Sequence, residues 1–258
     1  AFDRILAQLP MDEISQQYLR QMQPVILYLA TVYRRRENTQ AAYFCYFLIR
    51  NRLQRHMQMD EVQRVIAGYM DKDSMYCRVN ALKALCAFGS AQTVVDVLLD
   101  QDRKGTFFHS KVLVETLMTF TGDYQKLIGL LWERLKQFSI SFRRAVLDYI
   151  RFRSGDYCPQ MLKILLDHGQ DKELRFSAIR YFGRYPYPPA RKTLLEFVSD
   201  LDPQRWEYAA ISATSLARYP GQDAEEALLR AMHSGNWYVR YNAAASLEAL
   251  GVTYEQMI

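Results

Sequence analysis

The sequence of 258 residues has no long apolar run. Its two best, residues 25–33 and 41–49, are nine residues each, about half of what a membrane-spanning helix requires. Glycine and proline are also scarce, with 11 and 8 residues, too few for a disordered or low-complexity chain. No signal-peptide pattern opens the sequence. We therefore expect a folded protein that meets a membrane only through a segment missing from this chain.

Residues for metal or nucleophilic chemistry are few and scattered. The four cysteines form no CxxC pair, and the four histidines lie far apart in the sequence. Cys86 and Cys158 fall in apolar helical patterns, which predicts buried thiols in a reduced, cytoplasmic protein. A cytoplasmic domain of a membrane-anchored protein is the alternative. No GxSxG, glycine-rich phosphate loop or metal-ligand spacing is found, so we predict no catalytic residues, no metal site and no cofactor.

A helical pattern recurs along most of the chain. Helix-forming segments end at a glycine or proline every 31–34 residues. These stops are Gly89, Gly122, Gly155, Pro186, Pro220 and Gly251. Four residues before each stop lies an apolar residue, except that the third repeat has Arg151. A fixed period in the low thirties is typical of stacked helical repeats, and no strand pattern rises above it, so the sequence predicts an all-α fold.

The repeats set the predicted domain organisation. Residues 73–258 form one continuous array, in which residues 253–258 either end the stack or begin a further repeat. Residues 1–72 form an N-terminal helical cap and a degenerate repeat, with helices over 41–53 and 61–70. The aromatic residues Tyr43, Phe44, Tyr46 and Phe47 are predicted to lie in the core of this region. About six to seven helix pairs result.

A basic residue precedes five of the six stops by eleven positions. These residues are Arg78, Lys111, Arg144, Arg175 and Arg240. Because they recur with the period of the fold, we expect each to bind an acidic side chain or a helix-end carbonyl of an adjacent repeat. Trp206 and Trp237 also occupy equivalent positions and are predicted to pack on the turns between repeats.

The repeat pattern resembles that of HEAT-like repeats. The resemblance rests on Asp171 and Arg175, four residues apart, followed by Ala178, Ile179 and Phe182, and above all on residues 237–251. It implies a right-handed α-α superhelix of antiparallel helix pairs, with the second helix of each pair lining the concave side. Such scaffolds host many functions.

Charge divides between the two helices of each repeat. The first-helix segments carry 15 basic and 6 acidic residues, and the second-helix segments carry 8 basic and 14 acidic residues. If second helices line the concave side, that groove is acidic and suits a basic surface of another protein. We therefore predict a non-enzymatic protein–protein interaction scaffold. Its predicted partner-binding residues are Asp223, Glu225, Glu226, Arg230, Asp96 and Lys163.

The alternative function is nucleic-acid binding or DNA repair. The architecture and the basic, Trp-bearing helix starts, such as residues 142–144 and Trp206, are similar to those of alkylpurine DNA glycosylases built from HEAT-like repeats. An acidic groove would repel a phosphate backbone, which disfavours this alternative. The predicted contacts to an anionic surface are Arg34, Arg35, Arg36, Arg143 and Arg144.

Overall fold

The computed structural model describes residues 5, 8–10, 12–200 and 202–253. In this part of the chain all regular structure is helical and no strand occurs, which confirms the predicted all-α fold. Contacts divide the chain into two compact units, Ala1–Val146 and Leu147–Ile258, and the division falls inside helix α10 (Ile140–Arg153). The predicted domain boundary at residues 72/73 lies within the first unit and stays a prediction.

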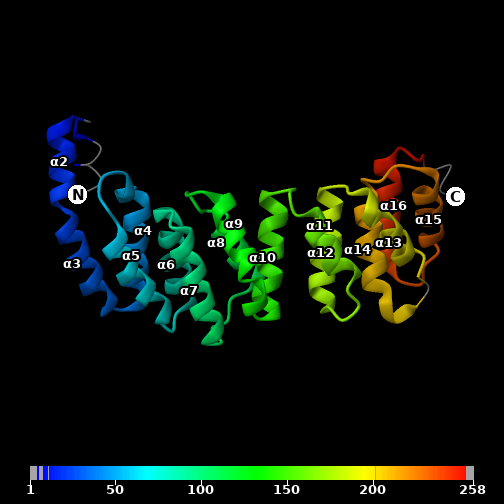
Figure 1. Cartoon of the computed structure of the whole chain (residues 1–258), viewed down its shortest axis with the longest axis horizontal. Coiled ribbons are helices and arrows are strands. Elements are labelled where there is room, and N and C mark those ends of the chain that lie inside the picture. Colours follow the sequence, from blue (N-terminus) through cyan, green and yellow to red (C-terminus); the bar gives the residue numbers. More distant parts are fainter. Residues whose placement is uncertain (1–4, 6–7, 11, 201, 254–258) are drawn as a thin grey trace. The chain divides into compact units, whose positions relative to one another are not determined.

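The first unit is built from antiparallel helix pairs joined by short turns (Figure 1). Several helices pack against the one two places further along the chain: α3 on α5, α4 on α6, α6 on α8 and α7 on α9. The helices are α2 (Glu13–Gln21), α3 (Gln23–Arg34), α4 (Asn38–Arg50), α5 (Asp60–Ala67), α6 (Met75–Phe88), α7 (Ala91–Arg103), α8 (Ser110–Leu117) and α9 (Tyr124–Glu133). Single 3-10 turns occur at Leu53–Arg55, Gly68–Asp71 and Leu135–Gln137.

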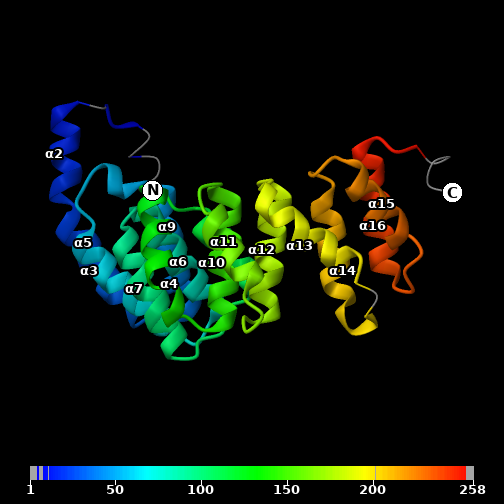
Figure 2. The ribbon, with the colours of Figure 1, turned by 45° about the vertical axis from the view of Figure 1, so that its right-hand side comes forward.

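The second unit continues the same plan from the last part of α10. Here α12 packs on α14, α14 on α16, and α13 on α15, and Figure 2 shows α14, α15 and α16 side by side. The helices are α11 (Cys158–Leu166), α12 (Lys172–Arg184), α13 (Pro188–Val198), α14 (Trp206–Leu216), α15 (Gln222–Ala231) and α16 (Trp237–Leu250). We call α6, α8, α10, α12, α14 and α16 the first helices, and α7, α9, α11, α13 and α15 the second helices.

Four of the six predicted stops follow the end of a first helix within two residues, whereas α8 ends at Leu117 and α14 at Leu216, five and four residues before Gly122 and Pro220. Gly89 and Gly251 follow α6 and α16 with φ of 80° and 89°, the left-handed conformation that glycine adopts without a steric cost. At the N-terminal end, the Asp12 side chain accepts a hydrogen bond from the Ser15 amide and caps the start of α2, a position where aspartate is favoured. Residues 254–258, which contain most of the tail after the last repeat, lie outside the described residues.

Successive repeats are joined by hydrogen bonds that span about one period of sequence. In the first unit, the Thr121 hydroxyl donates to the Ala87 carbonyl at 2.8 Å, and the Ser139 amide donates to Asp102 at 2.6 Å. In the second unit, the Ser215 hydroxyl donates to the Ile179 carbonyl at 3.0 Å. The Thr121 and Ser139 bonds pair groups at a helix end and just before a helix start, whereas the Ser215 bond reaches a carbonyl inside α12.

One aromatic prediction for the first unit is partly wrong. Phe44 is buried, but Tyr43 and Tyr46 are 65% and 46% exposed. Phe44 stacks on Tyr33 of α3 with ring centroids 4.9 Å apart, and this contact occupies the face of α4 toward its neighbour.

Among the residues that the structure describes, no helix has the length and apolarity that crossing a bilayer demands.

Gly122 meets the backbone of the preceding repeat. A Cβ atom added to Gly122 would lie 2.3 Å from the Gly89 carbonyl oxygen, a distance that requires a backbone shift. Gly129, in the middle of α9, has no atom within 4 Å of the corresponding position. Close packing at the first position and open space at the second therefore predict opposite effects of adding one methyl group.

We expect Gly122→Ala to destabilise the protein by about 1–3 kcal/mol, because overpacking forces the backbone of the two repeats apart. The matched control Gly129→Ala should stabilise it by about 0.5–1 kcal/mol, since alanine is the better helix former. Denaturant unfolding followed by circular dichroism measures both changes. Equal effects of the two substitutions would contradict the close packing at Gly122.

Two buried tyrosine hydroxyls join repeats in the second unit. Tyr219 Oη donates to the Phe182 carbonyl at 3.3 Å and accepts from the Tyr187 amide at 2.9 Å. Tyr181 Oη links the Ser154 carbonyl and the Tyr157 amide in the same way, each at 3.0 Å. Burial raises the pKa of both hydroxyls. Each hydroxyl thus bridges the end of one helix and the start of the next.

Tyr219→Phe should lower the free energy of unfolding by about 1–3 kcal/mol, because it leaves the Tyr187 amide and the Phe182 carbonyl without their partner. The control Tyr241→Phe, at a tyrosine that is 59% exposed, should change it by less than about 0.5 kcal/mol. Stability of the unsubstituted protein should fall as the pH rises above about 10, because the unfolded chain loses its tyrosine protons first. Urea titrations at pH 7 and above pH 10 test these effects. A Tyr219→Phe protein as stable as the control would show that the bridge is dispensable.

Candidate anion-binding site

Two of the five recurrent basic residues, Arg78 and Arg240, bind the turn that precedes their own helix, and Arg175 binds the Leu165 carbonyl at the end of α11. Arg78 Nη1 donates to the carbonyls of Lys72 and Asp73, both at 2.8 Å. Arg240 Nη1 donates to Ser234 and Gly235 at 2.7 and 3.1 Å. These guanidinium groups hold main-chain carbonyls, so the structural interpretation of this position agrees with the geometry, although the carbonyls belong to the entering turn.

The third repeat differs from the predicted spacing by one residue. There Arg143, one residue before the predicted Arg144, holds the preceding turn: its Nε donates to the Phe138 carbonyl at 2.7 Å and its Nη2 to the Lys136 carbonyl at 2.8 Å. The other predicted anionic-surface contacts, residues 34–36, are exposed at the end of α3. Residues 34–36 are therefore accessible at a helix end, whereas the Arg143 guanidinium group is bound to main-chain carbonyls.

The predicted partner-binding residues lie on second helices, and several are already paired. Asp223 on α15 forms an ion pair with Arg191 of α13, and the guanidinium lowers the pKa of this carboxyl. Glu226 lies 3.9 Å from Arg230 one helical turn away. In the first unit, Asp96 accepts a hydrogen bond from Gln92 at 2.8 Å. Glu225 is half-buried, and Lys163 on α11 is exposed.

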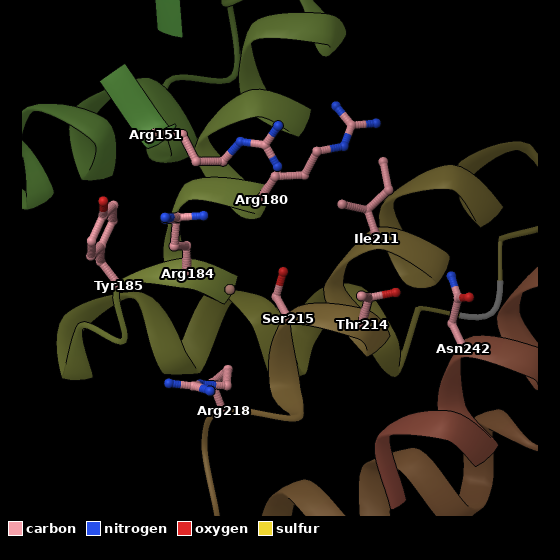
Figure 3. Close-up of a pocket in the computed structure, with 10 residues that line it drawn as sticks. Arg151, Arg180, Arg184, Tyr185, Ile211, Thr214, Ser215, Arg218 and Asn242 are labelled. Carbon is pink, nitrogen blue, oxygen red and sulfur yellow. The ribbon is translucent and has the colours of Figure 1, made fainter. Parts of the chain in front are cut away.

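A pocket of about 700 Å³ lies in the second unit on the row of first helices, away from all six of these residues. Figure 3 shows its arginines on neighbouring helices together with hydroxyl and amide groups. We call it the arginine pocket. Its lining residues are Arg151 from α10, Arg180, Gly183, Arg184 and Tyr185 from α12 and its end, Ile211, Thr214, Ser215 and Arg218 from α14 and its end, and Asn242 from α16.

Helical spacing brings these side chains to one surface. Arg180, Gly183 and Arg184 lie three and four residues apart on α12, so they share one face of the helix. Gly183 also brings α14 close: a Cβ at this position would lie 2.7 Å from Ser215 Oγ. The absence of a side chain here sets the depth of the pocket floor beside Ser215.

The pocket is strongly cationic. Four arginines line it, and its described lining has no aspartate or glutamate. Arg151 is 3.2 Å from Asp148 one turn earlier on α10, and Arg184 lies over the Phe152 ring at 5.6 Å. The Arg218 side chain is exposed and has no hydrogen bond or ion pair within the described part of the chain. The N–H groups of such an exposed guanidinium can donate to carboxylate or phosphate oxygens.

The polar groups between the arginines are already oriented. The Ser215 hydroxyl donates to the Ile179 carbonyl, and the Asn242 amide donates to the Ala210 carbonyl at 2.8 Å. Because both donors face main-chain oxygens, the guanidinium groups are the main donors that the pocket presents to a ligand. The described lining residues also include no histidine or cysteine that could activate Ser215.

Sequence reasoning missed this pocket, although two signals pointed to it. Arg151 interrupts the apolar column four residues before the stops. Three successive repeats, and no others, have an arginine two residues before the stop. These arginines are Arg153, Arg184 and Arg218. The structure shows that the second signal places Arg184 and Arg218 on the pocket, whereas Arg153 is not among its lining residues.

Other predicted residues have mixed outcomes. Trp206 stacks on Tyr238 of the next repeat with ring centroids 5.6 Å apart, as packing between repeats requires. Trp237 is 57% exposed and stacks on Tyr241 of its own helix, so the prediction that it packs on an inter-repeat turn is wrong. No repeat follows α16 in the described residues to cover this indole. The described residues also contain no group of three or more potential metal ligands.

Comparison with known proteins adds a likeness to solved structures. No protein-family model matches the chain, and no curated protein sequence does so. Among solved structures, it is similar to the designed armadillo repeat protein YIII(Dq)4CqI. The match covers 96% of this chain and 98% of that chain, with 16% sequence identity and a TM-score of 0.38.

Proposed function

We propose that this chain is a HEAT-like repeat protein that acts by binding, and that the arginine pocket holds an acidic segment of another protein. The observation that carries the proposal is the set of four arginines on three successive first helices, in a described lining without an acidic residue. Surfaces of one charge sign attract and orient partners of the opposite sign. Arginine also binds carboxylates in a bidentate geometry.

An extended polypeptide suits the layout of the pocket. Packed helices lie about 8–10 Å apart, so arginines on successive first helices repeat at about this distance. An extended chain advances about 3.3–3.6 Å per residue, and every third side chain of the partner would meet the next arginine. We therefore expect an acidic residue at about every third position of the bound segment.

The polar groups of the pocket support a binding role over catalysis. The Ser215 hydroxyl is directed at the Ile179 carbonyl at 3.0 Å, and nucleophilic catalysis by serine needs an adjacent base. The competing surface is the acidic set on α15, which would suit a basic partner. There Asp223 is neutralised by Arg191, whereas Arg218 in the arginine pocket carries no such partner among the described residues.

The proposal is tested with fluorescent 12-residue peptides and the full chain, followed by fluorescence anisotropy. One peptide carries glutamate at every third position, and a second carries lysine at the same positions. We expect the acidic peptide to bind, and the double variant Arg184→Gln/Arg218→Gln to weaken it at least tenfold, about the effect of losing one charge-assisted hydrogen bond.

The control variant Lys163→Gln/Lys192→Gln removes the same net charge from second helices and should bind the acidic peptide nearly as well as the unsubstituted protein. Three results would contradict the proposal: an equal loss in both variants, tighter binding of the lysine peptide, or tighter binding of a single-stranded oligonucleotide of matched charge. The second of these would favour the acidic set on α15, and the third would favour the nucleic-acid alternative.

A further inference from the structure

A second arginine-lined pocket lies in the first unit, where the end of α4 faces α2. Its volume is about 490 Å³, within the range of small-molecule sites. We call it the α2–α4 pocket. Its basic groups are Arg20 from α2 and Arg50, Arg52, Arg55 and His56 from the end of α4 and the turn after it. Among its described lining residues there is no aspartate or glutamate, and Leu9, Pro10 and Leu19 form an apolar wall.

The backbone at Arg52 is in an unusual conformation. Arg52 has φ 48° and ψ 42° and is the one non-glycine residue with positive φ among the described residues. This left-handed conformation disfavours residues with a Cβ, and glycine or asparagine usually occupies it. Hydrogen bonds hold the turn on both sides of Arg52. The side-chain amide of Asn51 donates to the Phe47 carbonyl at 2.8 Å, and the main-chain amide of Arg55 donates to the Arg52 carbonyl at 2.9 Å. An arginine at a position suited to glycine indicates that its side chain has a role.

Three of the arginines around the pocket have no polar contact that would hold their guanidinium groups within the described part of the chain. The side chains of Arg20, Arg52 and Arg55 are exposed and form no hydrogen bond or ion pair with any described residue. The dipole of α4 favours cations near its C-terminal end, which accounts for Arg50. The dipole of α2 accounts for Arg20 in the same way, but neither dipole accounts for Arg52 and Arg55, which follow the end of α4. Several unneutralised arginines around one pocket repel each other until an anion binds between them.

We propose that the α2–α4 pocket binds a small soluble organic phosphate. Arginine forks match the oxygens of a phosphate or pyrophosphate group. The volume excludes a folded partner, and the wall formed by Leu9, Pro10 and Leu19 suits the organic part of the ligand. This site is separate from the arginine pocket, which lies in the second unit.

The test is isothermal titration calorimetry of the full chain with inorganic pyrophosphate, with sulfate as the competing anion. We expect one pyrophosphate bound per chain at this site and a loss of affinity of at least tenfold in Arg52→Gly. Because glycine accepts the left-handed backbone, Arg52→Gly should also raise the melting temperature without ligand by about 2–4 °C. Loss of the fold therefore cannot explain the lost binding. Arg20→Gln should lose affinity without the gain in stability.

The control Arg64→Gln, at an exposed arginine of α5 outside the pocket, should bind pyrophosphate as the unsubstituted protein does. No binding of pyrophosphate, unchanged affinity in Arg52→Gly, or displacement by equimolar sulfate would overturn the proposal. Loss of this binding in Arg184→Gln/Arg218→Gln would place the anion in the arginine pocket and would also overturn it. Co-sedimentation with phosphatidic acid vesicles that is lost in Arg52→Gly would assign the phosphate to a lipid headgroup and overturn the soluble ligand.

Discussion

The structure depends on one constraint: helix ends that lie inside a stack must find their polar partners in the neighbouring repeat. Helices of 8–14 residues leave unpaired amides and carbonyls at each end. In the second unit the hydroxyls of Tyr181 and Tyr219 supply partners to two such ends at once. In the first unit Thr121 donates to the end of α6. Because these bonds join residues about one period apart, they set the register of each repeat on the previous one.

The same constraint separates structural from available basic residues. Arg78, Arg143 and Arg240 each hold carbonyls of the turn before their helix, so their charge serves the fold. Arg184 and Arg218 come two residues before the helix stops, where the entering turn is out of reach. The close approach of Gly183 to Ser215 brings these two helix ends side by side. A cationic pocket arises where stacking brings these side chains together with Arg151 and Arg180.

The sequence predicted the elements of the fold because each repeat is local. The stops at Gly89 and Gly251 and the cap at Asp12 follow from backbone preferences that act within a few residues. The role of Arg143 was not predictable from the period alone, which points to Arg144, because it depends on the carbonyls of Lys136 and Phe138 at the turn before α10. Exposure of Trp237 and Tyr43 depends on whether another helix covers them, and no local pattern carries that information. The arginine pocket depends on the lateral register between helices. The sequence shows the arginines that form it, but it does not predict that they lie next to one another.

The central claim is that Arg184 and Arg218 of the arginine pocket bind an acidic segment of another protein. It can be tested by observing their guanidinium groups directly. Nitrogen-15 NMR spectra resolve the Nε–Hε signals of arginine, and these signals report directly on hydrogen bonds to carboxylates. On titration with the acidic peptide, the account predicts that the signals of Arg184 and Arg218 shift in a saturable manner, while those of Arg191 and Arg230 on the second helices stay unchanged. Shifts confined to Arg191 and Arg230, or none at Arg184 and Arg218, would contradict it.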